Sequence, residues 1–386
     1  MEISFENQTY NHLIKKLGIS DNTFRIKLIK TIIPFGFCWL PLAIMTLLKG
    51  NFWTGDIENS FITNFDSQVR FLICLPILIL SEELISARLG LILGQFKNSG
   101  VIEKKEYKAF DQIISKGGRF LRSRWTLLVL ILICYIQVFT VLSYESEYTS
   151  ILTWQIHDAG EGAKLNCSGW WNILISRPIV FFLFLQWLLR IIVWGWILRK
   201  ISFLHLVLFP IHPDLSGGLG FIGYALRFFS PIAFAISATI AGNMIDFILI
   251  EGLSLRAFAF PGLAYFVFIS LLFTLPLFSF TSKLIEAREK SVFENYDFAN
   301  GMYRELRDKF LKGYDKVTTE DLKRPEFSAV SDLSDVIEYS LNMKYIPFTF
   351  RDLIPLWTMA ILPFLAVILM EIPLNEVFKV ILSFLV

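Results

Sequence analysis

The residues of this sequence with the clearest chemical potential are charged side chains that stand inside long apolar stretches. Glu82 and Glu83 interrupt one such stretch, and Arg190 interrupts another. Charged groups inside a bilayer are expensive, and they commonly pair with one another or line the path of an ion or solute. Counted from Arg70 and Arg177 at about 1.5 Å per helical residue, both sites lie roughly 20 Å along their helices. We therefore expect Arg190 to pair with one of the two glutamates, either as a static contact between helices or as the charged part of a permeation path.

A second candidate site is the loop FPIHPDLSGGLGFIG at residues 209–223, which joins two apolar stretches. Glycine amides at the start of a helix can bind an anion, such as a lipid headgroup or a cytoplasmic phosphate ligand. In the alternative interpretation the loop is a tight corner, in which the glycines permit close packing and Asp214 caps the following helix. His212 has no structural role in that alternative, and it would contact the ligand in the first interpretation. The residues assigned to this loop site are His212, Asp214, Gly217, Gly218 and Gly220.

A third pattern lies in the polar region after the sixth apolar stretch, where apolar residues recur at alternating steps of four and three. That spacing places them in one seam along a helix. We expect the seam either to pack on a second helix at 331–343 and on the 88–124 loop, or to join subunits of a homo-oligomer. The seam residues are Val292, Tyr296, Ala299, Tyr303, Leu306 and Phe310.

Long apolar helices must position all of these residues. The chain has 386 residues, of which 54% are hydrophobic, whereas a soluble domain is usually about 45–50% apolar. The excess is concentrated in runs of about 18 residues or more, the length that a helix needs to cross a bilayer. The sequence thus predicts an all-α polytopic integral membrane protein with about seven transmembrane helices. The predicted spans are Thr31–Leu48, Val69–Ala87, Trp125–Leu142, Ile175–Leu198, Leu226–Ile250, Phe258–Thr281 and Leu353–Met370.

The orientation follows from lysine and arginine, which favour the cytoplasmic side of a membrane. With this threading, 29 of the 36 Lys and Arg residues fall on the side of the N-terminus and six fall on the other side. The N-terminus is therefore expected in the cytoplasm and the C-terminus outside. The predicted organisation is a cytoplasmic segment at 1–30, six spans at 31–281 with cytoplasmic loops at 88–124 and 199–225, a cytoplasmic helical region at 282–352, and a seventh span with an interfacial helix at 353–386.

Charge and cysteine content argue against several classes of protein. The formal net charge is only +2, which gives no reason to expect a nucleic-acid partner. The four cysteines form no CxxC pair, so neither a zinc site nor a redox pair is expected. No cofactor and no metal is predicted. The expected partners are the lipid bilayer, further copies of the chain and a cytoplasmic protein.

The Glu82-Glu83 pair followed by Arg88 resembles the glutamate motif of the intramembrane CAAX-type protease family. In that family three residues separate the glutamate pair from the arginine, whereas four separate them here. The extra residue turns the arginine by about 100° around the helix. The family also uses histidines on neighbouring membrane helices, and none of the four histidines of this sequence falls within a predicted span. We therefore do not expect an enzyme.

The 209–223 loop, together with the pattern RDLIPLWTMAILPFLAVILMEIPLNEV near the end of the chain, resembles a group of bacterial polytopic membrane proteins that share an HPD-x-x-GGLG loop. The resemblance implies a shared fold and supplies no activity. We expect a multi-pass protein of the bacterial inner membrane that acts as an oligomeric channel-like or solute-permeation protein, gated or assembled through its cytoplasmic helices. The alternative is a membrane-embedded sensor or effector, for example in stress or phage defence, that acts with a cytoplasmic partner.

Overall fold

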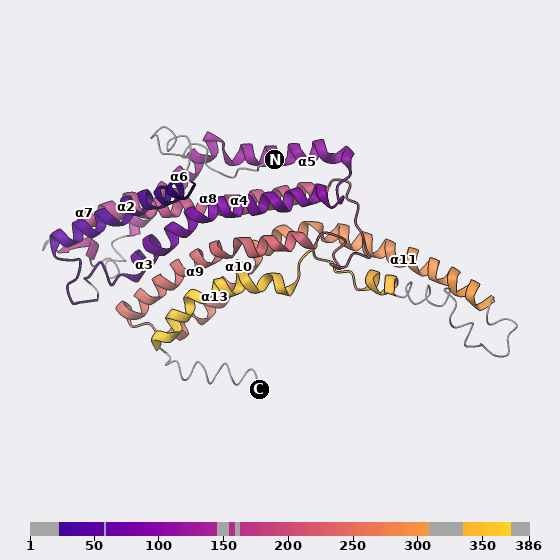
Figure 1. Cartoon of the computed structure of the whole chain (residues 1–386). Helices are drawn as coiled ribbons and strands as arrows, with labels where there is room; N and C mark the ends of the chain where they lie inside the picture. Colours follow the sequence, from indigo (N-terminus) through magenta and orange to yellow (C-terminus); the bar gives the residue numbers. More distant parts are fainter. Residues whose placement is uncertain (1–22, 58, 145–153, 159–162, 309–334, 372–386) are drawn as a thin grey trace.

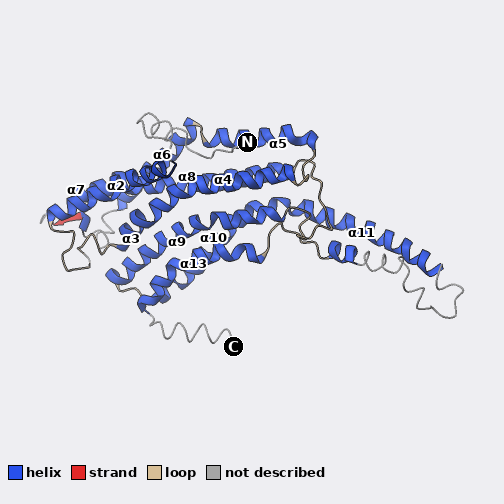
Figure 2. Ribbon diagram, viewed as in Figure 1, coloured by secondary structure: helices blue, strands red, loops and turns tan. Residues whose placement is uncertain are grey.

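The computed structural model of the chain describes residues 23–57, 59–144, 154–158, 163–308 and 335–371. Figure 1 shows long helices lying side by side in an elongated bundle, with α11 projecting from one end. A small antiparallel hairpin lies near the opposite end (Figure 2). The elements of the first half are α2 (Thr23–Lys49), α3 (Phe65–Gln68), η1 (Val69–Cys74), α4 (Leu75–Asn98), η2 (Lys104–Glu106), α5 (Tyr107–Leu121) and α6 (Arg124–Tyr144). Those of the second half are β1 (Ile156–Asp158), β2 (Ala163–Leu165), α7 (Cys167–Trp171), η4 (Asn172–Ser176), α8 (Arg177–Ser202), η5 (Gly220–Gly223), α9 (Tyr224–Glu251), η6 (Leu255–Phe258), α10 (Ala259–Thr274), η7 (Leu275–Phe280), α11 (Thr281–Leu306) and α13 (Phe350–Glu371).

Six helical segments of the described residues are long and apolar enough to cross a membrane, and they confirm the predicted all-α polytopic class. The second predicted span is also helical, as η1 and α4, but it carries Arg70, Glu82 and Glu83 and is not among the six. It is nevertheless packed within the bundle, against α2, α8 and α9. The predicted C-terminal interfacial helix and residues 1–22 of the N-terminal segment lie outside the described residues. The six segments are Thr31–Lys49, Arg124–Ser143, Cys167–Ser202, Gly220–Glu251, Leu255–Glu305 and Phe350–Met370.

Prolines within the apolar stretches do not end these helices. η1 and η4 are π-helical turns, and each lies directly before a helix that has proline at its second position, Pro76 in α4 and Pro178 in α8. Proline lacks an N–H, and its ring clashes with the carbonyl four residues earlier. A local change of helical pitch relieves that clash. As a result α7, η4 and α8 form one helical run, and so do η6, α10, η7 and α11, where η7 contains Pro276.

α9 lies at the centre of the bundle because small residues cover much of its surface. It is packed against α13, α4 and α3. At Gly242, an added side-chain carbon would lie 3.2 Å from the backbone oxygen of Phe65 and 3.2 Å from Cβ of Val69. Small residues permit such close approach between membrane helices, whose association depends on packing rather than on the hydrophobic effect. The buried small residues of α9 include Ala225, Ala233, Ala235, Ser237, Ala238, Ala241 and Gly242.

α6 and α10 carry the opposite kind of surface. Each exposes large apolar side chains along much of its length, and a continuous exposed apolar band marks a surface that contacts lipid or another protein. In a membrane bundle these two helices therefore provide lipid-facing surface. The exposed residues include Leu128, Val129, Leu132, Ile136 and Phe139 of α6, and Phe260, Leu263, Val267, Phe268 and Leu271 of α10.

Most of the predicted 88–124 loop is helical. α4 continues to Asn98, and α5 packs along α8. Gly117 permits this contact, because an added side-chain carbon would lie 2.9 Å from Cδ1 of Ile197. Four packed aromatic rings join α4, α5, η5 and η7 at this end of the bundle: Phe96, Phe110, Phe221 and Phe280.

Candidate functional site

The expected ion pair between α4 and α8 is formed by Glu82. Nη2 of Arg190 lies 2.5 Å from Oε1 of Glu82, and only 10% of the arginine side chain and 22% of the glutamate side chain are exposed. Trp187 supports the pair from α8, since the guanidinium of Arg190 lies 4.8 Å from the centre of its ring. The indole N–H of Trp187 donates to the carbonyl of Leu78 at 2.9 Å. Together these contacts fix α4 against α8 at the level of the buried charges.

Glu83 is turned away from this pair, because adjacent residues of a helix point about 100° apart. Its half-buried side chain lies at the edge of an outward stripe of α4 that is marked by the exposed residues Leu80, Leu84 and Leu91. α4 therefore carries acidic groups on two sides, one against α8 and one beside the surface of the single chain.

In the 209–223 loop, the backbone amides that were expected to bind an anion are bonded to the aspartate of the loop itself. The carboxylate of Asp214 accepts hydrogen bonds from the amides of Ser216 at 2.8 Å, Gly218 at 3.2 Å and Gly220 at 2.8 Å. Nδ1 of His212 lies 2.9 Å from the same carboxylate, and 47% of the histidine side chain is exposed. An external anion at these amides would have to displace Asp214.

The loop also ties the membrane helices to the segment that precedes α13. The backbone adopts positive φ angles of 55° at Leu215, 63° at Gly217 and 85° at Gly218, a region that glycine enters without the steric strain met by other residues. This course presents the carbonyl of Leu215 to the amide of Lys344, which donates to it at 2.7 Å. The positive φ angles thus give the loop the shape that allows the hydrogen bond between Leu215 and Lys344.

A second arginine–carboxylate pair joins α9 to α13. Arg227 donates from Nη2 and Nε to Oδ1 of Asp352 at 2.8 and 3.2 Å. Oδ2 of Asp352 accepts from the amide and the hydroxyl of Thr349 at 2.9 and 2.8 Å, and so caps the start of α13. Gly223 leaves room for this carboxylate, because an added side-chain carbon would lie 2.9 Å from Oδ2.

The predicted seam on α11 is only partly covered. Ala299 is buried and Val292 is half-buried, whereas Tyr296 and Tyr303 are exposed. The side chain of Leu306 and the whole of Phe310 lie outside the described residues.

A neighbouring face of α11 contacts residues 335–345 through polar groups. The hydroxyls of Ser291 and Ser340 lie 3.1 Å apart, and the side-chain amide of Asn295 donates to Ser340 at 2.7 Å. Nη2 of Arg288 donates to the carbonyl of Leu341 at 2.6 Å. α11 therefore packs on residues 335–345, while several of its aromatic side chains stay exposed.

Sequence reasoning missed a cluster at the end of the bundle where α9 ends. The depth of Asp246 along its span predicts a solvated position at the external surface, and that prediction is wrong, since only 3% of Asp246 is exposed. Its carboxylate accepts hydrogen bonds from the amides of Phe65 and Asp66, both at 2.8 Å, and from the side chain of Asn64 at 3.0 Å. The amides at a helix start have no partner within the helix and carry the positive end of its dipole. Asp246 of α9 thus caps the helical run that begins with α3.

Two arginines share Asp66 in the same cluster. Arg70 of η1 forms an ion pair with one carboxylate oxygen of Asp66, and Nη2 of Arg177 lies 3.8 Å from the other. Nε of Arg70 is buried and has no hydrogen-bond partner within the described residues. The cluster joins η1, α8 and α9 at one level, in agreement with the equal depths expected for the two arginines.

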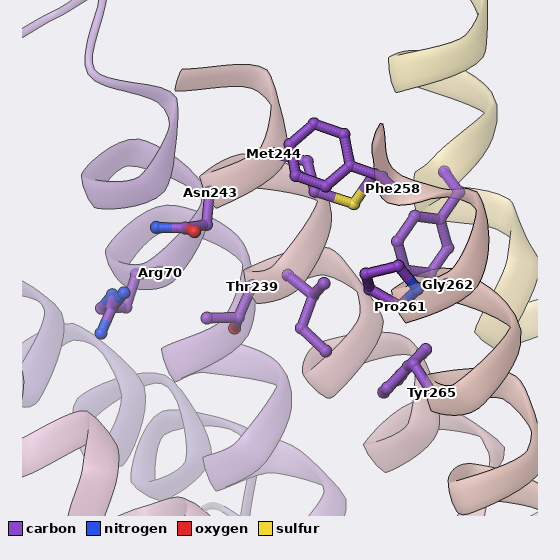
Figure 3. A pocket seen from close by; sticks show the side chains of 10 residues that line it. Arg70, Thr239, Asn243, Met244, Phe258, Pro261, Gly262 and Tyr265 are labelled. Atoms are coloured by element: carbon purple, nitrogen blue, oxygen red, sulfur yellow. The ribbon is translucent and has the colours of Figure 1, made fainter. Parts of the chain in front are cut away.

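A cavity of about 330 Å³ adjoins Arg70. Figure 3 shows Arg70 and Asn243 on one side of it, and Phe258, Pro261 and Tyr265 on the other. The lining comes from η1, α9, η6, α10 and α13. No single stretch of the sequence contains enough of these residues to form a motif, so the site could not be found from the sequence.

In the part of the chain that the structure describes, no group of three or more His, Cys, Asp or Glu side chains is placed to hold a metal ion. Comparison of the chain with protein families, with curated proteins and with solved structures gave no match. Functional conclusions therefore rest on the geometry of the residues described above.

Proposed function

We propose that this multi-span membrane protein assembles as an oligomer and lets an ion or a small polar solute permeate, with Glu82 and Arg190 at the charged part of the path. The observation that carries the proposal is the largely buried pair between α4 and α8. Replacing a buried ion pair by apolar side chains is often neutral or stabilising, so stability alone is a poor reason for such a pair. Charged groups within membrane helices commonly mark ion and solute pathways.

The outward stripe of α4 supports assembly from several copies. A single chain leaves Leu80, Leu84 and Leu91 uncovered, with Glu83 at the edge of the stripe. An exposed apolar stripe of this kind marks a surface that contacts lipid or another protein, and further copies of the chain would cover it. We assign the assembly to the bacterial inner membrane because of the HPD-x-x-GGLG resemblance.

The second candidate is a membrane-embedded sensor or effector, for example in stress or phage defence, that acts with a cytoplasmic partner. The exposed aromatic side chains of α11 favour it, among them Phe293, Tyr296 and Phe298. Aromatic residues are enriched in protein interfaces, and α11 projects away from the bundle (Figure 1). This candidate predicts a soluble partner whose binding is lost in the Phe293→Ser and Phe298→Ser variants while membrane insertion is unchanged.

Flux through reconstituted liposomes tests the permeation proposal. The purified chain is placed in vesicles, and the flux of K⁺, Na⁺, Cl⁻ and H⁺ is followed with ion-sensitive dyes. We expect flux of at least one of these ions, and a change of about tenfold, equal to about 1.4 kcal/mol in a barrier, in Glu82→Gln or Arg190→Gln.

Arg227→Gln is the matched control, because it breaks an arginine–carboxylate pair elsewhere in the bundle. With equal amounts of folded protein, we expect this variant to keep the wild-type flux. Permeation is rejected if the wild-type vesicles pass none of the four ions and also fail to release small polar solutes such as glycerol and urea, or if Glu82→Gln and Arg227→Gln alter flux to the same extent.

A further inference from the structure

We infer that the cavity beside Arg70 binds the anionic head and the first part of the chain of an amphiphile from the external leaflet, with a carboxylate or phosphate as the head. The cavity has a volume of about 330 Å³. At about 30 Å³ per water molecule, this equals roughly eleven waters. The space suits a head with a short length of chain, and the rest of the amphiphile would stay in the bilayer.

Arg70 and Asn243 form the polar side of the cavity, and each has a hydrogen-bonding group without a partner among the described residues. A guanidinium has five N–H donors and no acceptor, and Nε of Arg70 is buried without a partner among the described residues. Asn243 lines the same cavity, and its side-chain amide forms no hydrogen bond with any described residue. Polar groups in this state are the ones that a bound ligand or water would satisfy. A head rich in acceptors fits them.

The nearby carboxylates are engaged elsewhere. Asp66 is shared between the guanidinium groups of Arg70 and Arg177. Asp246 is directed at the amides of Phe65 and Asp66, which start the α3 run. Neither carboxylate is among the residues that line the cavity, whereas Arg70 is, so the charged side chain at the cavity wall is a cation.

The rest of the lining is apolar. The hydroxyl of Tyr265 is bonded to that of Ser237 at 2.7 Å, and the hydroxyl of Thr239 donates to the carbonyl of Ala235 at 3.0 Å. Both residues therefore contribute mainly carbon to the cavity. The remaining apolar lining includes Ile240, Met244, Phe258 and Phe364.

The wall formed by α10 gives access from the membrane. Pro261 is exposed and Gly262 is partly exposed, and they lie across the cavity from Arg70 (Figure 3). The neighbouring Phe260 and Leu263 are 80% and 63% exposed and face lipid. Open space surrounds Gly262, because an added side-chain carbon would meet nothing within 4 Å. An amphiphile dissolved in the bilayer would thus reach the site through the gap that this glycine leaves.

Photo-crosslinking with a substitution at Gly262 tests the inference. The full chain in phosphatidylcholine vesicles is exposed to palmitic acid bearing a diazirine, to phosphatidylglycerol bearing the same chain, and to the corresponding fatty alcohol. Labelled positions are mapped by mass spectrometry. Gly262→Trp fills the cavity, whereas Gly262→Ala adds one carbon in open space and is the matched control.

We expect labelling at residues 239–244 and 258–265 that falls at least about tenfold in Gly262→Trp and is unchanged in Gly262→Ala. The alcohol should label roughly tenfold less than the acid, because a charged hydrogen bond is lost. Labelling by the acid alone identifies a free amphiphile, labelling by phosphatidylglycerol alone identifies a membrane lipid, and either supports the site. Equal labelling of the wild type and Gly262→Trp overturns it, and so does labelling by the alcohol that equals the labelling by the better of the two anionic amphiphiles.

Asn243→Leu keeps the test decisive if Gly262→Trp does not fold. Leucine has a similar shape to asparagine and removes one polar group of the head site. We expect this variant to lose labelling by the acid and to keep labelling by the alcohol. Unchanged labelling by the acid would overturn the assignment of the head to Arg70 and Asn243.

Discussion

Replacing Asp246 by alanine should detach the C-terminal end of α9 from the start of α3. The carboxylate accepts three hydrogen bonds, from the amides of Phe65 and Asp66 and from the side chain of Asn64. Each hydrogen bond to a charged group contributes about 1.5–3 kcal/mol, and a buried donor left alone costs about 1–3 kcal/mol. The three bonds share one group and do not add independently, so we expect a total loss of about 3–5 kcal/mol.

Asp246→Asn provides a graded version of the same perturbation. The amide keeps one carbonyl oxygen as an acceptor, but its NH₂ group faces a backbone N–H, so we expect about half of the loss seen with alanine. Thermal unfolding of the purified chain in detergent measures the loss, and hydrogen exchange locates it. Exchange should accelerate at residues 64–70 and stay unchanged in α13.

Glu251→Ala is the matched control for these variants, because Glu251 is an exposed acidic residue at the end of the same helix. It should melt like the wild type. The capping argument is refuted if Asp246→Ala also melts like the wild type and the amides of 64–70 exchange at the wild-type rate.

The remaining predictions concern the end of the bundle where α9 begins. Gly223→Val places carbon where 2.9 Å separates an added Cβ from Oδ2 of Asp352, so we expect a lower yield of folded protein in size-exclusion chromatography, and a normal yield would contradict the close packing. Asp214→Ala removes the acceptor for three loop amides, and we expect a loss of about 2–4 kcal/mol in thermal unfolding. An unchanged melting temperature would mean that the loop keeps its shape without the aspartate.

The pairing of Glu82 with Arg190 could be predicted because depth in a membrane helix follows directly from residue number. Helices rise by the same distance per residue, so the depth of a residue in each of two spans that run in the same direction can be counted from a common level. Arg70 and Arg177 marked that level. The same counting failed for Asp246. It lies at the same level as Arg70, as the counting predicts, but its partners are backbone amides about 180 residues away in sequence. Almost every residue carries a backbone amide, so no residue type in the sequence marks these two as partners.

The positions of the helices could also be predicted from the sequence only in part. Long apolar runs predict which segments are helical, because they need to satisfy their backbone groups inside a membrane. The run of α4 passes its predicted end at Ala87 and also Gly90 and Gly94, and reaches Asn98, just before Gly100 turns the chain with a φ of 74°. The cavity beside Arg70 depends on how five elements meet, which is set by packing and not by local spacing.

The helical run from η6 through α11 spans Leu255–Glu305 without interruption. α11 alone has 26 residues and is therefore about 39 Å long. Where the run stays rigid, it is a lever arm attached to a membrane span. A tilt of about 5° in α10 then displaces the far end of α11 by roughly 3 Å, which is about the length of a hydrogen bond. Rearrangements too small to open a bundle of membrane helices are thus magnified at the far end of α11.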